Sequence, residues 1–277
     1  MSGHLSAQQI AQYRRDGFLF PVRVMSAADA AGYKAKLEAY ERAAGGPISG
    51  NRRHKVHLLF TWAAELVRNP AILDAVEGIL GPDLMVWGTD FFIKEPRDPG
   101  FVSWHQDSTY WGLDPADIVT AWVAFSDAPV ESGAMKFMPG SHLIDQLPHV
   151  DTFHEHNLLT RGQEIAVEVD EAKAVDVALR AGEMSLHHVR LVHGSKPNTT
   201  GNRRIGFAIR YVPTYVRPVK IRDGAMLVRG TDRYDHFAAE VAPAADLDDA
   251  AIAAHTQSIQ RQIAALYEGT DRTEMRP

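Results

Sequence analysis

Hydrophobic positions recur at helical spacing through the first third of the chain. Ile10 and Tyr13 mark the first such segment, and Ser6 is suited to cap its amino terminus. A segment rich in Ala, Lys and Glu then ends at Gly45 and Gly46, which are typical helix terminators. The pattern predicts helices over residues 6–15, 26–44, 58–67 and 70–80, with a short strand at 18–24 and an irregular loop at 47–53.

From residue 84 onward the period changes to that of short β-strands divided by Gly, Pro and Asp. The strands predicted from this pattern are 84–94, 118–126, 165–169, 175–179, 183–186 and 204–212. Such a cadence is typical of a jelly roll or barrel. A helical pattern returns at about 247–267, so we expect a mainly β protein with flanking helices (α+β), built on a double-stranded β-helix (jelly roll, cupin-like) core.

The organisation along the chain favours a single domain. The 277 residues, 45% of them hydrophobic, can bury a substantial core, and neither an internal repeat nor a low-complexity segment divides them. We therefore expect one domain over residues 1–277, with a helical part at 1–82, a β core at about 83–215 and a helical tail at about 245–268.

Composition excludes several classes of chemistry. The chain has no cysteine, so any metal must be held by His and carboxylate side chains. Its net charge is -6 without a basic stripe, which argues against nucleic acid as a partner. No apolar leader and no apolar run of about 18 residues is present, so we expect a cytoplasmic protein that binds a small molecule and no membrane, as a monomer or homodimer.

The histidines supply one promising metal motif. His105 and Asp107 are separated by one residue, so on an extended backbone their side chains point to the same side. One imidazole and one carboxylate form two corners of a facial site of the kind that Fe(II) oxygenases use. The motif is short, and an exposed His and Asp at a strand end is the competing interpretation. The third ligand is sought in the segment LHHVRLVHGSKPN, where His193 begins a turn and His187-His188 is more typical of strand packing.

An Fe(II) oxygenase that uses 2-oxoglutarate also needs a permanent cation for the distal carboxylate of that cosubstrate. Arg204 lies 11 positions after His193 on a predicted strand, and Ser195 offers a second donor. Strand alternation lets only one of Arg203 and Arg204 face the pocket. If the register shifts by one residue, Arg203 takes the place of Arg204.

The chain resembles the phytanoyl-CoA dioxygenase family of Fe(II)/2-oxoglutarate oxygenases. The resemblance runs from the amino-terminal helix to about Pro213 and is strongest in the following motifs: WHQD at 104–107, AWVAF at 121–125, SGAMKFMPGSH at 132–142, and HGSKPN through RR at 193–204. It implies that His105, Asp107 and His193 are the catalytic iron ligands and that Arg204 binds the distal carboxylate. Positions matching neighbours of the cosubstrate in this family are Gln106, Trp122, Ser195 and, less closely aligned, Lys55.

This resemblance implies an enzyme that uses Fe(II), 2-oxoglutarate and O2 to hydroxylate an aliphatic C–H bond of a small metabolite, releasing succinate and CO2. The carboxylate of Asp107 favours hydroxylation over halogenation. Candidate substrate contacts are Tyr110, Trp111, Arg52 and Arg53, although aromatic residues at strand spacing are usually core and charge runs are usually solvated. The alternatives are an acyl-CoA hydroxylase, a non-catalytic cupin-like binding protein, and a metal-dependent hydrolase or isomerase on a cupin barrel.

Overall fold

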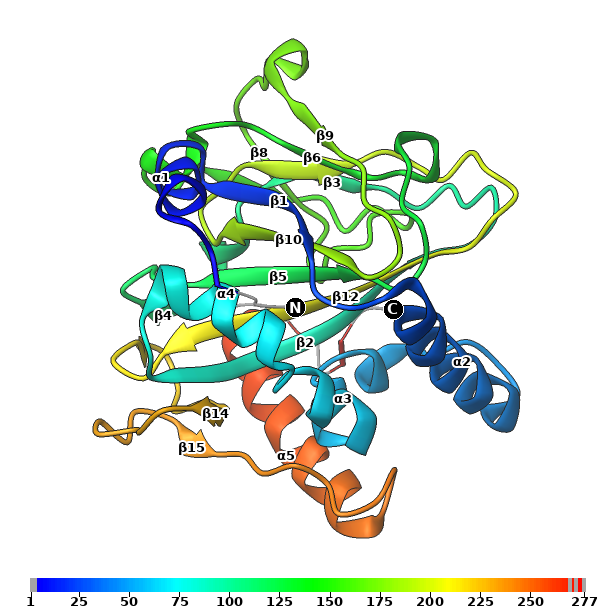
Figure 1. Cartoon of the computed structure of the whole chain (residues 1–277), viewed down its shortest axis with the longest axis vertical. Coiled ribbons are helices and arrows are strands. Elements are labelled where there is room, and N and C mark those ends of the chain that lie inside the picture. The colour runs from blue at the N-terminus through cyan, green and yellow to red at the C-terminus, as the bar shows by residue number, and fades with distance from the viewer. Residues whose placement is uncertain (1–3, 269–270, 272–273, 276–277) are drawn as a thin grey trace.

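The computed structural model describes residues 4–268, 271, 274 and 275, and its centre is formed by two β-sheets (Figure 1). The larger sheet contains, in spatial order, β1 (Phe18–Arg23), β10 (Glu183–His188), β5 (Val119–Ala124), β12 (Arg204–Pro213), β2 (Leu84–Lys94), β14 (Gly224–Arg229) and β15 (Ala238–Ala239). The smaller sheet contains β3 (Val102–His105), β11 (His193–Ser195), β6 (Met135–Phe137) and β9 (Val175–Val177). Short pairs join β4 (Leu113–Asp114) to β13 (Arg217–Pro218) and β7 (His149–Asp151) to β8 (Gln163–Ile165).

The two faces of the larger sheet meet different partners, and strand alternation decides which residue faces which. Trp122 and Ala208 point toward the smaller sheet and pack with Phe137 of β6. Their neighbours Val123 and Phe207 point the other way, into a second cluster beneath the helices. Both faces of β5 and β12 are therefore buried, which explains why these strands are almost continuously hydrophobic. Two mainly antiparallel sheets packed face to face form the jelly roll that the strand cadence predicted.

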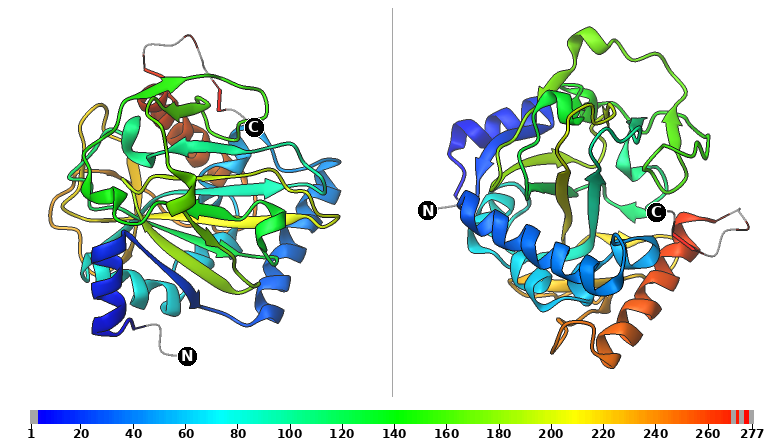
Figure 2. Two further views of the ribbon diagram at one scale, coloured as in Figure 1. Left: turned by 90° about the horizontal axis from the view of Figure 1, so that it is seen from above. Right: turned by 90° about the vertical axis from the view of Figure 1, so that its right-hand side faces the viewer.

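Helices cover the outer face of the larger sheet and its lower edge (Figures 1 and 2). Their bounds are α1 (Ala7–Asp16), α2 (Ala27–Ala44), α3 (Thr61–Leu66), α4 (Pro70–Leu80) and α5 (Asp249–Leu266). The predicted starts of the first two are confirmed, because Ser6 and Ser26 each accept a hydrogen bond from the backbone N–H three residues later. Gly45 adopts the left-handed conformation expected at the end of α2. None of the helices in the described part of the chain is long and apolar enough to cross a bilayer.

The differences from the predicted elements lie mostly in the shortest strands. The strand predicted at 165–169 is wrong, because β8 ends at Ile165 and the next four residues form no strand. His193 was expected to begin a turn, but it begins strand β11 and pairs with His105 on β3. Strands β3, β6 and β11 contain only three or four residues, too few for a period of two to be recognised in the sequence.

Candidate metal centre and the adjoining cavities

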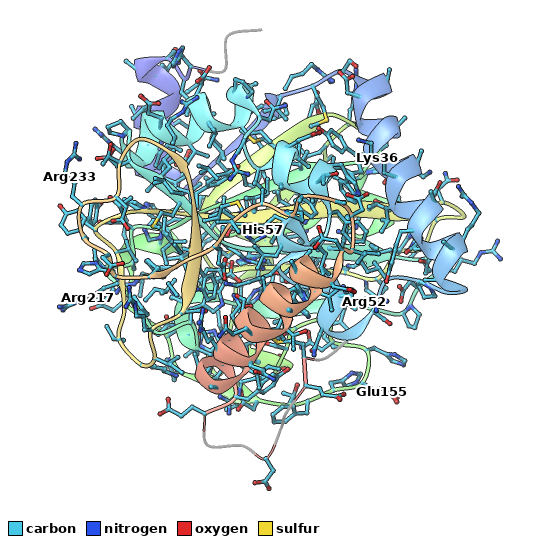
Figure 3. All side chains as sticks on the ribbon, turned by 90° about the horizontal axis from the view of Figure 1, so that it is seen from below. Lys36, Arg52, His57, Glu155, Arg217 and Arg233 are labelled. Atoms are coloured by element: carbon cyan, nitrogen blue, oxygen red, sulfur yellow. The ribbon has the colours of Figure 1, made fainter. Side chains whose placement is uncertain are left out.

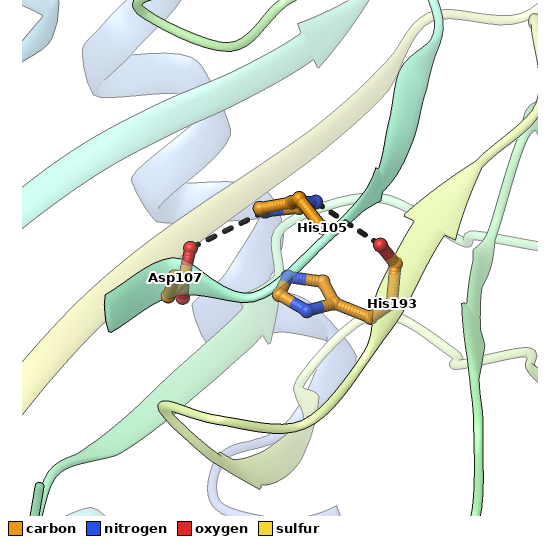
Figure 4. Close-up of side chains that lie close together, drawn as sticks. All are labelled: His105, Asp107 and His193. Carbon is orange, nitrogen blue, oxygen red and sulfur yellow. Dashed lines mark hydrogen bonds and ion pairs between the residues drawn. The ribbon is translucent and has the colours of Figure 1, made fainter. Parts of the chain in front are cut away.

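His105, Asp107 and His193 come together where the smaller sheet faces β12 (Figure 4). Strand β3 ends at His105, Gln106 stays extended, and Asp107 begins a short 3-10 turn, so the first two ligands point to the same side as expected. Pairing of β11 with β3 places His193 directly across from His105. One candidate ligand atom from each of the three buried side chains lies within 4.8 Å of the other two.

Hydrogen bonds to backbone carbonyls orient both imidazoles. Nδ1 of His105 lies 2.9 Å from the carbonyl of Ser103 and 3.0 Å from that of His193, and Nδ1 of His193 lies 2.9 Å from the carbonyl of Leu191. An Nδ1–H that donates to a carbonyl leaves Nε2 as the metal-binding atom. Nε2 of His105 is 3.3 Å from Oδ1 of Asp107, which is the spacing of two ligands prepared for one ion.

The protonation states also suit a divalent metal. Burial raises the pKa of Asp107, but the hydrogen bond from His105 and the nearby histidine charges outweigh this and lower it to about 2. Burial holds the pKa of His193 well below its usual value, and the charge of His105 acts in the same direction. At neutral pH the site therefore presents the carboxylate of Asp107 and the neutral imidazole of His193, the forms that bind metal. Two nitrogens and one oxygen fit Fe(II) and also its Ni(II), Co(II) or Zn(II) substitutes.

His187 lies beside this cluster, although the sequence assigned His187-His188 to strand packing. Its Nε2 is 3.9 Å from Oδ2 of Asp107, and its Nδ1 is buried without a hydrogen-bond partner. Alternation along β10 points His187 into the barrel, where it lines the cavity beside the metal ligands, while His188 lines a pocket elsewhere. Each of these two histidines therefore lines a pocket in addition to packing within its strand. His187 is not one of the three clustered ligands.

A cavity next to the metal ligands is lined by Trp122, Ser195 and Arg204. The Arg204 side chain is 2% exposed; Nη1 donates to the carbonyl of Gly133 at 2.6 Å, and Nε is buried without a hydrogen-bond partner. Arg203 points outward and pairs with Glu41 at 2.7 Å. Of these two adjacent arginines, Arg204 therefore faces the cavity and Arg203 does not. The alternative, in which a one-residue shift puts Arg203 in the place of Arg204, is excluded.

Trp122 forms one wall of the same cavity, with its indole ring 5.3 Å from the Arg204 guanidinium carbon. Its ring lies over Gly206 so closely that a Cβ on that residue would be 1.8 Å from the indole. Position 206 therefore requires glycine because a side chain there would collide with Trp122, and not because of its backbone angles. The strand that carries Arg204 also makes room for the aromatic ring beside it.

Lys94 is a functional candidate that the sequence analysis missed. It lies opposite Arg204 in the β2–β12 register, fully buried, and Nζ donates to Oγ of Ser195 at 2.7 Å and to the carbonyl of Lys196. Burial, reinforced by the charge of Arg204, lowers the pKa of Lys94 to about 6. Within the described residues neither side chain forms an ion pair with a carboxylate, so a carboxylate ligand would be the first anion to pair with the Arg204 guanidinium and would favour the charged form of Lys94. The sequence signal that could have identified Lys94 is a lysine at the end of a hydrophobic strand.

Two residues expected beside the cosubstrate are used elsewhere. Gln106 does not line the cavity; its amide donates to the carbonyl of Arg190 at 2.9 Å and accepts from the backbone of Leu147 at 2.8 Å, which fixes a loop. Lys55 donates to Oε1 of Glu240 at 2.8 Å and to the carbonyl of Gly224 at 2.9 Å, beneath β2. These acceptors hold the ammonium group of Lys55 away from the cavity, so the structure contradicts the expected contact.

A second cavity, of about 60 Å³, adjoins the first and shares Phe92, Asp107 and Arg210 with it. Trp111 and Arg53 line this second cavity, as expected for substrate contacts. Tyr110 and Arg52 line neither cavity.

The side chains of Tyr110 and Arg52 have other roles. The hydroxyl of Tyr110 donates to Asp151 at 2.6 Å, and the guanidinium of Arg161 lies over its ring. Arg52 is exposed and donates to the hydroxyl of Tyr40 at 3.2 Å (Figure 3). Of the four weak substrate candidates, only Trp111 and Arg53 line the cavity that Asp107 also lines.

Comparison with known proteins gives matches over most of the chain. The family model described as phytanoyl-CoA dioxygenase (PhyH) matches residues 13–206. A solved structure of a protein described as the non-heme monooxygenase ThoJ, in its apo form, is 40% identical, with a TM-score of 0.83 over 93% of this chain and 97% of that chain. Among curated relatives, a probable alpha-ketoglutarate-dependent hypophosphite dioxygenase of Stutzerimonas stutzeri is 29% identical over 59% of this chain and 57% of its own length.

An ectoine dioxygenase of Nocardia farcinica is 27% identical over 72% of this chain and 74% of its own length. The chain spans little more than half the length of the hypophosphite dioxygenase that it matches. The similarity to ThoJ extends over nearly the whole of both chains, so the helices and both sheets are shared, and the jelly-roll fold expected from the sequence is confirmed.

Proposed function

Because the chain belongs to the phytanoyl-CoA dioxygenase family, we propose that it is an Fe(II)- and 2-oxoglutarate-dependent dioxygenase that hydroxylates an aliphatic C–H bond of a small metabolite. The observation that carries this proposal is one shared cavity, with a cluster of three potential metal ligands on one wall and the buried guanidinium of Arg204 on another. Either feature alone would also suit a protein of a different class. Together they match a metal that is chelated by one end of a dicarboxylate whose other end needs a cation.

In this proposal each side chain has a defined task. His105, Asp107 and His193 would hold Fe(II) and leave adjacent positions open toward the cavity. Arg204 and Ser195 would bind the distal carboxylate of 2-oxoglutarate, and Lys94, which donates to Ser195 from behind the cavity lining, would add a nearby ammonium group.

When bound, Fe(II) and 2-oxoglutarate supply the oxidising chemistry, in which decarboxylation of the cosubstrate to succinate and CO2 drives oxygen insertion into the substrate. The protein's own part is to place the target C–H bond and to exclude water. Trp122 and the two fully buried strands β5 and β12 serve the second purpose, since they close the cavity from the barrel interior.

The cavity favours a small substrate over a long acyl-CoA. The second cavity, where the substrate would lie, has a volume of about 60 Å³, which suits a compact molecule. The hypophosphite and ectoine enzymes among its relatives are named for small molecules, which supports the same choice. A non-catalytic cupin-like protein has no need of Arg204 and Lys94 buried side by side. A single domain, a monomeric or homodimeric state and a cytoplasmic location stay predictions.

Succinate formation from 2-oxoglutarate tests the proposal. We expect the iron-loaded protein to form succinate under oxygen, slowly alone and faster with its substrate, and to stop when a chelator is added. Asp107→Ala should abolish turnover, and Arg204→Gln should raise the KM for 2-oxoglutarate by about 10- to 100-fold, because a charge-assisted pair is lost.

Arg203→Gln is the matched control, because it removes the same charge from the outer face of the same strand. Its KM for 2-oxoglutarate should stay within about twofold of the wild-type value. Iron-loaded protein that binds no 2-oxoglutarate and forms no succinate would contradict the assignment.

A further inference from the structure

Arg210 occupies the junction between the cosubstrate cavity and the second cavity, and the proposed chemistry does not use it. It lies six residues after Arg204 on β12, and side chains at even spacing on a strand share one face. Arg204, Ala208 and Arg210 consequently line the same cavity. Strand β12 thus carries a guanidinium at each end of the cosubstrate cavity. The guanidinium of Arg210 lies at the end from which the substrate would approach the metal site.

The guanidinium of Arg210 is held in place, but not all of its N–H donors have a hydrogen-bond partner. It is 7% exposed and lies 5.3 Å from the ring centre of Trp111 and 5.9 Å from that of Phe92. Its Nη1 forms an ion pair with Asp90, whereas its Nε is buried without a hydrogen-bond partner. Burial lowers the pKa of Arg210 to about 9, which leaves it charged at neutral pH. A buried donor without an acceptor is costly, and a ligand oxygen would remove that cost.

Arg53 adds a second cation to the same cavity. Its Nε and Nη2 donate to the carbonyl of Phe91, both at 2.9 Å, and its remaining amino group is not used in these bonds. Against these two guanidinium groups stands the carboxylate of Asp90, which already contacts His54 through one oxygen and Arg210 through the other. Asp107, the other carboxylate in the lining, belongs to the proposed metal site. Apart from Asp107, two guanidinium groups and one carboxylate line this cavity.

Aromatic rings form the rest of the wall. The centres of the Trp87 and Trp111 rings are 4.7 Å apart, and Phe92 lies on the side shared with the cosubstrate cavity. Asp223 accepts a hydrogen bond from Nε1 of Trp87 at 2.7 Å, so that indole presents no free donor to the cavity. The surface thus offers apolar faces next to a guanidinium pair.

We propose that the substrate is a small organic monoanion, a carboxylate, whose charged end contacts Arg210 and Arg53 and whose body lies against Trp87, Trp111 and Phe92. This inference rests on the proposed function, because it places the anion beside a metal-bound cosubstrate. Arg210 is then a specificity-determining residue that selects for charge. Arg204, at the other end of the cavity, selects the cosubstrate, with Lys94 behind Ser195 in support.

Three ring compounds of similar size but different charge test this: benzoate, benzamide and benzylammonium. Each is titrated calorimetrically into the Fe(II)- and 2-oxoglutarate-loaded protein without oxygen, while the visible charge-transfer band of the iron–2-oxoglutarate complex is recorded. We expect benzoate to bind about tenfold or more tightly than benzamide, since a charge-assisted hydrogen bond is stronger than a neutral one, and benzylammonium to bind most weakly. The band should persist throughout.

Arg210→Gln should reduce benzoate affinity to that of benzamide. The double variant Arg210→Gln/Asp90→Asn should do the same, and it guards against misfolding because it leaves no unpaired carboxylate. Arg52→Gln is the control, since it removes the same charge next to Arg53 but from the exposed surface, and should keep the full preference.

Each other result of these titrations contradicts either the inference about the substrate or the proposed function. Equal affinities for benzoate and benzamide, no benzoate binding, or a preference that survives both Arg210 variants overturns the inference and leaves the proposed function intact. Bleaching of the band by benzoate would show displacement of 2-oxoglutarate from Arg204, and also overturns the inference. If the band never forms, the proposed function fails, and the inference fails with it.

Discussion

At the residue scale, Lys94 shows how burial changes the protonation of an ordinary lysine. Its pKa of about 6 leaves the amine mostly neutral at pH 7.5 before a ligand binds. An incoming carboxylate favours the charged form, so binding of 2-oxoglutarate should take up close to one proton at that pH. Calorimetric titration of the metal-loaded protein in two buffers of different ionisation enthalpy measures this uptake. A binding enthalpy that does not depend on the buffer would contradict it.

Lys94→Met should abolish the proton uptake and weaken 2-oxoglutarate binding by about tenfold or more. Lys196→Met is the control, because this nearby lysine is 68% exposed and pairs with Glu171 on the surface. The sign of the stability effect follows from the same shift. Between pH 6 and 10.5 the unfolded chain binds a proton that Lys94 in the ligand-free fold does not, so the free energy of unfolding rises with pH across this window. The Lys94→Met variant should lack this contribution.

At the scale of the elements, the metal site joins two short strands. Strand β3 has four residues and β11 has three, and their pairing is irregular between His193 and Ser195. Such strands have few ladder hydrogen bonds of their own. A metal bound by His105 and His193 should therefore stabilise this pair more than it stabilises the long β2–β12 pair.

Hydrogen exchange with and without Ni(II), an air-stable substitute for Fe(II), measures this effect. At a metal concentration of about 100 Kd the folded state gains about 2.7 kcal/mol, and exchange at β3 and β11 should slow by up to about 100-fold. Amides in the middle of β2 and β12 should change less, and Asp107→Ala should remove the effect. Uniform slowing across both sheets would show that the metal acts on global unfolding instead.

At the scale of the whole molecule, a buried ion-pair cluster connects segments far apart in sequence. Lys55 joins the loop before α3 to Gly224, 169 residues away, and to Glu240, 185 residues away. Burial raises the pKa of Glu240, but the charges of Lys55 and His57 outweigh this and lower it to about 2, so this carboxylate is ionised at neutral pH. Asp223 in this cluster also anchors Trp87, a wall of the substrate cavity.

Lys55→Met should therefore destabilise the fold by about 3–5 kcal/mol, since two buried carboxylates lose their cation. The affinity for 2-oxoglutarate should stay unchanged at temperatures where the variant is folded. Urea denaturation and calorimetric titration measure the two quantities, with the exposed Lys36→Met as control (Figure 3). A stable variant with weakened 2-oxoglutarate binding would restore the role that the family resemblance implied for Lys55.

The sequence alone determined the features that depend on local pattern or on residue type. Capping serines and terminal glycines fixed the ends of α1 and α2, the hydrophobic run of 84–94 fixed β2, and the pair His105 and Asp107 fixed two candidate ligands, because each signal lies within a few residues. Only the tertiary structure decided the features that depend on strand pairing and burial. In the folded chain Lys94 lies opposite Arg204, and Arg203 points outward. Lys55 pairs with Glu240, and Arg210 lies at the junction of two cavities. These features could not be read from the sequence, because strand register and desolvation arise between segments that are distant in the chain.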